Sequence, residues 1–327
     1  MKSILLTNSM IKNYTGSELD VCSVGSELVR MGYRVEAAAY ELGDPLMSQY
    51  ADSGIVFTNL QEQDLVFKEY DLIIGHHNTI FTDCIMREDI RYEKVVFSSL
   101  SPGMSIEYPP ECANDLTLCM ANSSETYDRM KTLGVKEENI VIFPNYILPD
   151  FFDTVREKRQ TLRKICVVSN HVAEEVKQAV DILAGAGNGV TADLYGQEYQ
   201  SVLVTPELLV QYDVVITIGK TVQYCFGCKV PVYCYDIHGG PGWLNRGNFA
   251  VAANYNFSGR GFDRRLTAME LVMDIVKGYV PALDYLELFH QIGRERYDLR
   301  VNLQRLLEQI DSLPEIDQKA FTAKYRK

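Results

Sequence analysis

Short apolar runs with the length and β-branched content of strands recur along the chain, separated by stretches with helical periodicity. This alternation predicts an α/β fold in which crossover helices join parallel strands. In the first half the runs cover residues 4–7, 35–39, 71–75, 95–98, 116–121 and 140–143. In the second half they cover residues 164–169, 191–195, 212–218 and 230–236.

The periodicity breaks between the two series. Residues 146–163 are irregular and contain Pro149, Asp150 and a charged run, which is typical of a linker. A chain of 327 residues also exceeds the roughly 250–300 residues at which a single core stops growing. We therefore predict two domains, 1–150 and 151–327, with one large doubly wound sheet as the alternative.

A regular apolar stripe near the C-terminus predicts a helix with one buried face. We assign this helical segment to the second domain and expect it to have a structural role. The stripe consists of Leu299, Leu303, Leu306, Leu307 and Ile310.

Composition narrows the class of protein. Apolar residues make up 46% of the chain and charged residues 23%, so both halves can bury a core. The formal charge of −12 argues against a nucleic-acid partner, because binding phosphate backbones requires a basic surface. The N-terminal apolar run is too short for a signal peptide, and no stretch approaches the roughly 18 apolar residues of a membrane span.

Eight cysteines in a chain of this length are typical of reduced, buried thiols rather than of a disulfide framework. We therefore expect a cytoplasmic protein without a transmembrane segment. Peripheral membrane contact and the oligomeric state are left open.

In the first half, the strand at 4–7 leads into a loop and then a helix that opens at Gly16, Ser17 and Glu18. A glycine before a helix N-terminus lets backbone N–H groups approach a phosphate or a sugar. The alternative is an ordinary N-cap, with Thr15 or Ser17 as the capping residue.

The strand at 71–75 ends in His76, His77 and Asn78. Titratable groups at the carboxyl end of a strand lie where α/β domains bind ligands, although a lone histidine is usually structural. We therefore take both histidines as candidates for a site.

In the second half, two strands lead into loops that suit a phosphate group. The strand at 164–169 runs into Ser169-Asn170-His171, and the strand at 212–218 runs into Gly219-Lys220-Thr221. Glycine allows close backbone approach, and lysine offers a point charge to a diphosphate. Val214 occupies the position of the first Walker A glycine, so a P-loop NTPase is excluded.

The strand at 230–236 opens into a glycine-rich loop, His238-Gly239-Gly240-Pro241-Gly242. We expect this loop to contact a ligand, and a tight turn without a ligand is the alternative. A zinc site is a weaker hypothesis, because its cysteines fall at core positions of a strand and a helix. Its four ligands would be Cys225, Cys228, Cys234 and His238.

Residues 118–152 resemble the end of the first domain in retaining GT-B glycosyltransferases, the nucleotide-sugar-dependent group 1 or family 4-like type. That family has a strand ending in Asn-Ser, a helix ending in Leu-x-x-Gly and a strand ending in Pro-Asn before the linker. The matching residues are Asn122, Ser123, Gly134, Pro144 and Asn145.

The resemblance extends to both domains. Gly16-Ser17-Glu18 is similar to the first glycine loop of the family, and the spacing from Asp71 to His76 matches the family's Asp-to-His spacing. In the second domain, Gly219-Lys220-Thr221 and Val230-Pro231-Val232 are similar to the Gly-x-Thr helix and the x-Pro-Val strand, with Gly239-Gly240 following.

This chain departs from the family pattern at the sugar-donor site. Asn170 and Glu175 stand where the family has an arginine and a lysine, and Tyr224 stands in place of the second glutamate. The glycine before the x-Pro-Val strand is replaced by Lys229. Neutralising the diphosphate then falls to His171, Lys220 and helix N-termini.

The resemblance implies a GT-B fold, in which two Rossmann-like domains face each other across a cleft, with a C-terminal helical segment. It implies transfer of a sugar from a nucleotide-sugar, expected to be a UDP-sugar, to a glycan or lipid-linked acceptor in bacterial-type cell-surface polysaccharide synthesis. No metal ion and no cofactor besides the sugar donor are implied.

The alternatives are a non-catalytic GT-B-like subunit that binds glycan or a partner transferase, and a nucleotide-sugar epimerase. A dehydrogenase is weaker, since no Gly-x-Gly-x-x-Gly follows a predicted strand. We expect His76 to act in catalysis and Gly16, Ser17, Glu18 and His77 on the acceptor or sugar side. The expected donor-binding residues are Ser169, Asn170, His171, Gly196, Gly219, Lys220, Thr221, Gly239 and Gly240.

Overall fold

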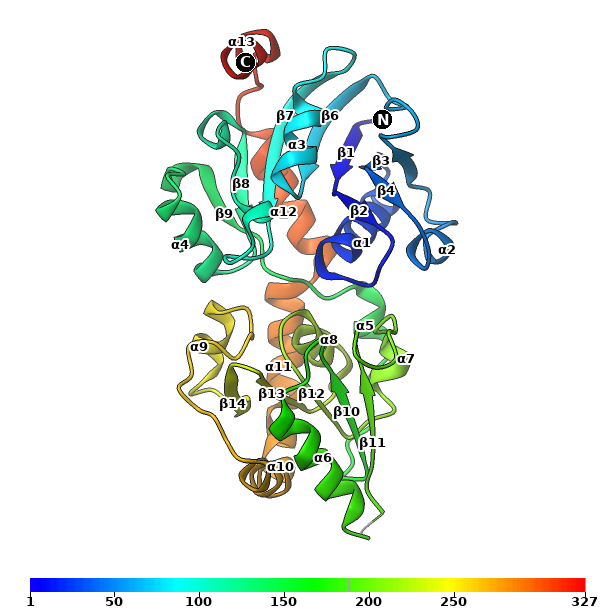
Figure 1. Cartoon of the computed structure of the whole chain (residues 1–327), viewed down its shortest axis with the longest axis vertical. Helices are drawn as coiled ribbons and strands as arrows, with labels where there is room; N and C mark the ends of the chain where they lie inside the picture. The colour runs from blue at the N-terminus through cyan, green and yellow to red at the C-terminus, as the bar shows by residue number, and fades with distance from the viewer. Residues whose placement is uncertain (188, 327) are drawn as a thin grey trace. The chain divides into compact units, whose positions relative to one another are not determined.

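The computed structural model describes residues 1–187 and 189–326 and divides into two compact units (Figure 1). Unit 1 contains Met1–Phe143 and the segment that begins at Leu303, and unit 2 contains Pro144–Asn302. These limits differ from the predicted domains in two places, at the start of unit 2 and at the C-terminal segment.

The first difference concerns the predicted linker. Unit 2 begins before residue 151 because Tyr146, Ile147, Phe151 and Phe152 are buried, three of them in a core of unit 2. Helix α5 (Pro149–Asp153) also forms inside the segment that was expected to be irregular.

The second difference concerns the C-terminal stripe, which is buried as predicted. Helix α12 (Leu299–Asp311) begins in unit 2, and its part from Leu303 onward belongs to unit 1. The assignment of this segment to the second domain was therefore wrong. Leu303 and Leu306 lie beside Val21 and Met120 of unit 1, and this packing accounts for the placement.

Unit 1 is built on a parallel sheet with the strand order β5-β3-β1-β6-β7-β8-β9. All six strands predicted for the first half are confirmed. Strand β5 was missed because it is a short, half-buried edge strand that ends in Thr58 and Asn59. The bounds are β1 (Ser3–Thr7), β3 (Arg34–Ala39), β5 (Val56–Asn59), β6 (Glu69–Gly75), β7 (Arg91–Ser99), β8 (Leu118–Ala121) and β9 (Ile140–Ile142).

Helices cover both faces of this sheet. Helix α1 (Gly16–Arg30) and α12 share one face, and α3 (Asn78–Ile85) lies on the opposite face with the core around Ile73 and Val95. The remaining elements of unit 1 are β2 (Met10–Ile11), β4 (Glu41–Leu42), α2 (Leu46–Gln49), α4 (Ser124–Thr132) and α13 (Gln318–Tyr325), with short 3-10 turns at Ser105–Glu107, Ala113–Asp115 and Glu137–Asn139.

Unit 2 contains a sheet with the order β11-β10-β12-β13-β14. The four strands predicted for the second half are confirmed and are parallel. Strand β14 pairs antiparallel with β13, so the segment predicted as a glycine loop forms a strand from Gly239 onward. The bounds are β10 (Lys164–Val168), β11 (Thr191–Tyr195), β12 (Val214–Thr217), β13 (Val232–Asp236) and β14 (Gly239–Trp243).

Side chains alternate between two cores across this sheet. Val167, Ile216 and Tyr233 face a core that includes residues of α6 (Glu174–Gly185) and α10 (Ala268–Ala282). Cys166 and Val215 face a second core, which α5, α8 (Lys220–Cys228) and α11 (Leu286–Ile292) help to form. Unit 2 also contains α7 (Pro206–Leu209), α9 (Phe249–Asn254), a 3-10 turn at Leu283–Tyr285 and a π-helical turn at Gly293–Tyr297.

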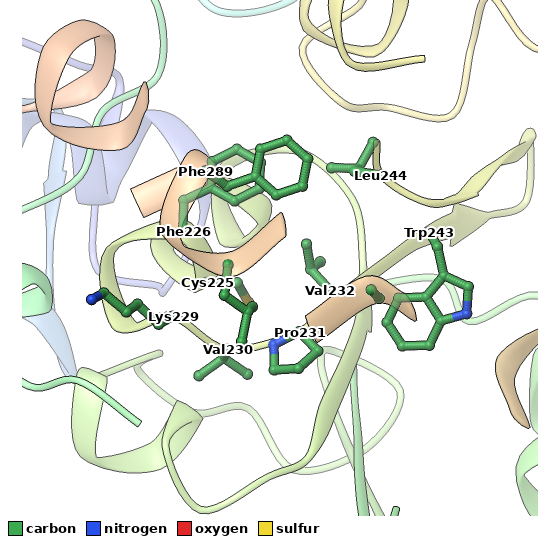
Figure 2. A pocket seen from close by; sticks show the side chains of 11 residues that line it. Cys225, Phe226, Lys229, Val230, Pro231, Val232, Trp243, Leu244 and Phe289 are labelled. Atoms are coloured by element: carbon green, nitrogen blue, oxygen red, sulfur yellow. The ribbon is translucent and has the colours of Figure 1, made fainter. Parts of the chain in front are cut away.

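A small apolar pocket opens in unit 2 beside α8 and α11 (Figure 2). Phe226, Val232, Leu244 and Phe289 line it, and its volume is only about 10 Å³. That volume is comparable to a single water molecule, so the pocket is a packing defect rather than a ligand site. Within the described residues, no helix has both the length and the apolar character needed to cross a membrane.

Close packing of α10 on β14 gives a test of this fold. A Cβ added at Gly278 would lie 2.2 Å from Cδ1 of Trp243, the only tryptophan of the chain. We expect Gly278→Ala to lower the free energy of unfolding by about 1–3 kcal/mol through overpacking and to change the tryptophan fluorescence. Gly185→Ala is the control, because its added Cβ would meet no atom within 4 Å; equal stability of the two variants would contradict the packing.

Candidate functional site

The strand order places a topological switch point at the carboxyl edge of each sheet, which is where open α/β sheets generally bind ligands. In an open α/β sheet, the crevice forms where consecutive connections leave in opposite directions. In unit 2 the chain passes from β10 through α6 to β11 on one side, whereas β12 lies on the other side of β10. Ser169 follows β10 and Gly219 follows β12, so both lie at this switch point.

Helix α8 begins directly at this edge. Gly219 is its N-cap, with φ 63° and ψ −140°, a conformation that only glycine adopts readily. A side chain placed there would meet no atom within 4 Å, so the space next to Gly219 is open. The helix N-terminus presents backbone N–H groups and a partial positive charge to an anion.

A strained loop adjoins this helix N-terminus. Asn256 and Phe257 are both non-glycine residues with φ 52°, and the carbonyl of Phe257 accepts a hydrogen bond from Gly219 N–H at 3.0 Å. Left-handed backbone at such residues costs about 1–3 kcal/mol each and is frequent at functional sites. The strain therefore marks this loop as a candidate part of the site.

The next residue, Ser258, was not predicted. It is 7% exposed, and its hydroxyl has no hydrogen-bond partner among the described residues. A buried hydroxyl without a partner is costly and is usually satisfied by a ligand or by water. The sequence carries no periodic or charge signal at this position.

Ser169, Asn170 and His171 form the other wall of the switch point. The Ser169 hydroxyl donates to Asp236 Oδ2 at 3.1 Å and accepts from His171 N–H at 3.1 Å. The side chains of Asn170 and His171 are exposed. Burial raises the pKa of Asp236, whereas the hydrogen bond from the Ser169 hydroxyl acts to lower it.

Gly196 and the Gly239-Gly240 pair have structural explanations. A Cβ at Gly196 would lie 1.8 Å from the Ser169 carbonyl oxygen. At Gly239 and Gly240 it would lie 2.2 Å and 2.3 Å from the carbonyl oxygens of Arg264 and Cys234. These glycines let backbone segments approach each other, which shapes the edge of the sheet.

Lys220 is placed differently from the expectation that its charge faces a diphosphate. Its Nζ is buried and lies 3.9 Å from the ring centroid of Tyr146 and 5.8 Å from that of Tyr224. Tyr224 in turn stacks on Phe151, with ring centroids 4.1 Å apart. The ammonium group therefore packs on aromatic faces, while Thr221 is half-buried at the start of α8.

In unit 1 the switch point lies between β1 and β6, and His76 and His77 follow β6. His76 is 3% exposed. Its Nδ1 lies 3.1 Å from the Ser98 carbonyl oxygen and its Nε2 lies 2.9 Å from Asp20 Oδ2. Both nitrogens thus face acceptors inside the protein, an arrangement that suits an imidazolium ion and offers neither nitrogen to a sugar.

His77 is half-buried next to His76, and its ring nitrogens lie near Ser9, Ser17 and Glu107. Its backbone is in the left-handed region, with φ 61°. Its Nδ1 accepts from Ser9 N–H at 3.3 Å, so the proton of the neutral ring lies on Nε2, which is 3.3 Å from Ser17 Oγ and 3.6 Å from Glu107 Oε1. Burial, together with the neighbouring His76, lowers the pKa of His77 to about 4.

Glu107 and Asp20 were not predicted, because they come from a 3-10 turn and a helix far from β6 in the sequence. Glu107 is 3% exposed and accepts from Leu100 N–H at 2.9 Å. Burial raises its pKa, although the charge of His76 acts in the opposite direction. The sequence gives no signal of this buried charge cluster.

The glycine loop of unit 1 is held by its own glutamate. Glu18 is buried and accepts hydrogen bonds from the N–H groups of Lys12 and Asn13 and from the Thr15 hydroxyl. Both of its carboxylate oxygens are thereby used on the loop. Gly16 opens α1 without positive φ and with open space around it, so no backbone constraint requires glycine there.

The hypothetical zinc ligands do not converge. Cys225, Cys228 and Cys234 are buried thiols. The Cys228 thiol donates to the Phe151 carbonyl at 3.4 Å and the Cys234 thiol to the Phe257 carbonyl at 3.2 Å. Among the described residues, no group of three or more His, Cys, Asp or Glu side chains is arranged to hold a metal ion.

Comparison with known proteins identifies the fold. No family model and no curated protein sequence matches this chain. The structure of Anabaena HepE in complex with UDP-glucose matches with a TM-score of 0.66 and 15% identity, covering 96% of this chain and 100% of that chain.

Two further solved structures agree. A glycosyltransferase from Rickettsia africae gives a TM-score of 0.59 at 12% identity, covering 94% of this chain and 97% of its own. Sucrose-phosphate synthase from Thermosynechococcus elongatus gives a TM-score of 0.57 at 10% identity, covering 95% of this chain and 100% of its own. These likenesses show the fold, which is GT-B with two Rossmann-like domains.

The ion pair of His76 and Asp20 predicts a pH dependence of stability. Burial lowers the pKa of His76, but the hydrogen bond to Asp20 and the charges of Asp20 and Glu107 raise it by more, so the folded pKa lies above 6.5. The pair therefore stabilises fully below about pH 6.5 and loses this contribution as the pH rises through the folded pKa.

We expect His76→Gln to lower the free energy of unfolding by about 3–5 kcal/mol at pH 6, because the buried charge pair between His76 and the Asp20 carboxylate is lost. Denaturant titrations between pH 6 and 9 should show a smaller difference between wild type and variant at the alkaline end. A difference that does not change with pH would contradict a charged His76.

Proposed function

We propose that this protein is a glycosyltransferase that takes a sugar from a UDP-sugar bound at the switch point of unit 2. The observation that carries the proposal is the joint presence of the α8 N-terminus, the open space at Gly219 and the buried hydroxyl of Ser258. One neighbour with this fold, Anabaena HepE, has been solved in complexes with UDP, with UDP and glucose, and with UDP-glucose, which supports this choice of nucleotide.

The diphosphate would lie against the N-terminus of α8. Backbone N–H groups of the first turn and the Ser258 hydroxyl would donate hydrogen bonds to it, and Asn170 and His171 would close the site from the side of β10. Preorganised dipoles of this kind stabilise the charge that develops on a leaving diphosphate. In this proposal catalysis needs no metal ion, since the protein groups supply the positive potential.

The acceptor, a glycan or a lipid-linked sugar, would bind to unit 1. We assign the hydroxyl-binding role to His77 rather than to His76, because only His77 has a nitrogen that faces Ser17 and the half-buried edge of the unit. His76 and Asp20 would hold the segment that carries His77 in place.

A non-catalytic sugar-nucleotide-binding subunit is the second candidate. The observation in its favour is Tyr224, which replaces a family glutamate and is stacked on Phe151. UDP binding without sugar transfer would favour this function.

Ser258 provides a sharp test of the nucleotide site. We expect Ser258→Ala to weaken UDP binding by about 1.5–3 kcal/mol, roughly 10- to 150-fold, because a hydrogen bond to a charged phosphate is lost. The same change should leave the unfolding temperature unchanged or higher, since the hydroxyl has no partner without ligand. Calorimetry with UDP measures the affinity, and thermal denaturation without UDP measures the unfolding temperature.

Ser23→Ala is the matched control, because Ser23 is also buried but lies on α1 of unit 1. We expect its UDP affinity to equal that of wild type. Equal affinity of Ser258→Ala and wild type would refute a phosphate contact by Ser258.

The role of His77 is tested by His77→Gly, which removes the ring and relieves the left-handed backbone. We expect turnover to fall roughly 10- to 100-fold with unchanged UDP affinity, because the ring would contact a hydroxyl group of the acceptor bound to unit 1. Lys229→Gly is the control, since Lys229 ends α8 with φ 53° and gains the same backbone relief. Full activity of His77→Gly would show that this histidine is structural.

A further inference from the structure

Helix α10 of unit 2 exposes an unusual apolar stripe. Met269, Met273, Val276 and Val280 are 55%, 46%, 53% and 49% exposed. At 100° per residue they fall within a narrow sector of the helix surface. Most other large exposed apolar residues of the described chain lie on separate elements, so this stripe is a continuous surface rather than scattered exposure.

The stripe cannot be hidden by rotating the helix, because the opposite side of α10 is fixed. Gly278 lies against the indole of Trp243, and Trp243 Nε1 donates to the Asp274 carbonyl at 3.1 Å. The Tyr233 hydroxyl donates to Asp274 Oδ2 at 2.6 Å. Leu271 and Ile275 are each 1% exposed in the core shared with α6.

We propose that this stripe binds the same stripe of a second copy of the chain, with the two α10 helices antiparallel across a twofold axis. The spacing of the four residues is four, three and four, which reads the same in both directions. An antiparallel pair therefore places Met269 opposite the partner's Val280 and Met273 opposite the partner's Val276. Self-complementarity of this kind is what an isologous interface requires.

The charges beside the stripe fit the same arrangement. Glu270 and Lys277 are exposed and lie on one flank of the stripe. In an antiparallel pair related by a twofold axis, the equivalent flanks of the two helices lie on the same side of the interface. Each Glu270 therefore comes within about two residues of the partner's Lys277 along the helix. The mixed signs of this flank and the net charge of −12 disfavour an anionic lipid surface as the occupant.

A single helix pair buries less than the roughly 800 Å² per partner of stable interfaces. The dimer should therefore be reversible, with a dissociation constant on the order of 10–100 µM. The surface belongs to unit 2, and this inference does not depend on the proposed sugar transfer.

Cysteine cross-linking tests both contact and orientation. All eight natural cysteines are buried, so a mild oxidant should act on introduced thiols. We expect Met269→Cys mixed with Val280→Cys to form a disulfide-linked dimer. Each variant alone should remain largely uncross-linked, because like positions at the ends of the stripe are about 16 Å apart in the antiparallel pair.

Sedimentation velocity of the full chain gives the second reading. The wild type should show a concentration-dependent dimer, and Met273→Glu should be monomeric at all concentrations. Met104→Glu is the control, because Met104 is 57% exposed in unit 1, and it should dimerise like wild type. If Met273→Glu fails to fold, cross-linking of Met269→Cys with Val280→Cys still tests whether the antiparallel dimer forms.

Three results would overturn the proposal. Cross-linking of Met269→Cys alone as efficiently as the mixture would exclude the antiparallel register. A wild type that stays monomeric at 100 µM or above, on the order of the dissociation constant expected for so small an interface, and forms no cross-link would exclude the dimer. A monomeric wild type that sediments with phosphatidylglycerol vesicles, while Met273→Glu does not, would assign the stripe to a membrane instead.

Discussion

The carboxyl edge of unit 2 depends on one backbone hydrogen bond, from Gly219 N–H to the carbonyl of Phe257. The same carbonyl accepts from the Cys234 thiol of β13 at 3.2 Å. The Phe257 carbonyl oxygen thus contacts the start of α8 and strand β13, and it belongs to the strained loop itself. This over-determined contact keeps Asn256 and Phe257 in left-handed backbone and holds Ser258 buried beside a helix N-terminus.

At its switch point unit 1 has a buried pair of titratable side chains, His76 and Asp20, whereas unit 2 has the N-terminus of a helix. His76 lies between Asp20 and the Ser98 carbonyl, and its charge bears on His77 and Glu107. Burial, together with the neighbouring His76, lowers the pKa of His77 and keeps its ring neutral, and the Ser9 N–H fixes the tautomer by donating to Nδ1. A neutral ring with a defined N–H is suited to recognising a hydroxyl group, whereas His76 behind it is held by Asp20 and the Ser98 carbonyl.

The sheets could be predicted from the sequence because strand periodicity and length are local properties. Strand β14 could not, since its glycines resemble a loop and its pairing depends on the close approach of the Gly240 backbone to the Cys234 carbonyl. The burial of Phe151 and Phe152 in a core of unit 2 could not be predicted, because proline and charged residues interrupt the apolar pattern around them. The C-terminal stripe showed that α12 is buried but not which unit it packs on.

The candidate site was predictable only in its location. The strand periodicity correctly predicted that Gly219, Ser169 and the two histidines follow the carboxyl ends of strands. The choice between His76 and His77 depends on Asp20, which lies 56 residues away in the sequence and 2.9 Å away in space. Likewise Ser258 becomes notable only through its burial without a partner, and Lys220 only through its contact with Tyr146.

Hydrogen–deuterium exchange of the full chain with and without UDP tests the central claim most directly, because it reports where the nucleotide acts along the backbone. The account predicts slower exchange in residues 219–223 and 256–261 when UDP is present, with little change in residues 8–18. Protection confined to residues 8–18 and 76–81 would contradict a nucleotide site in unit 2.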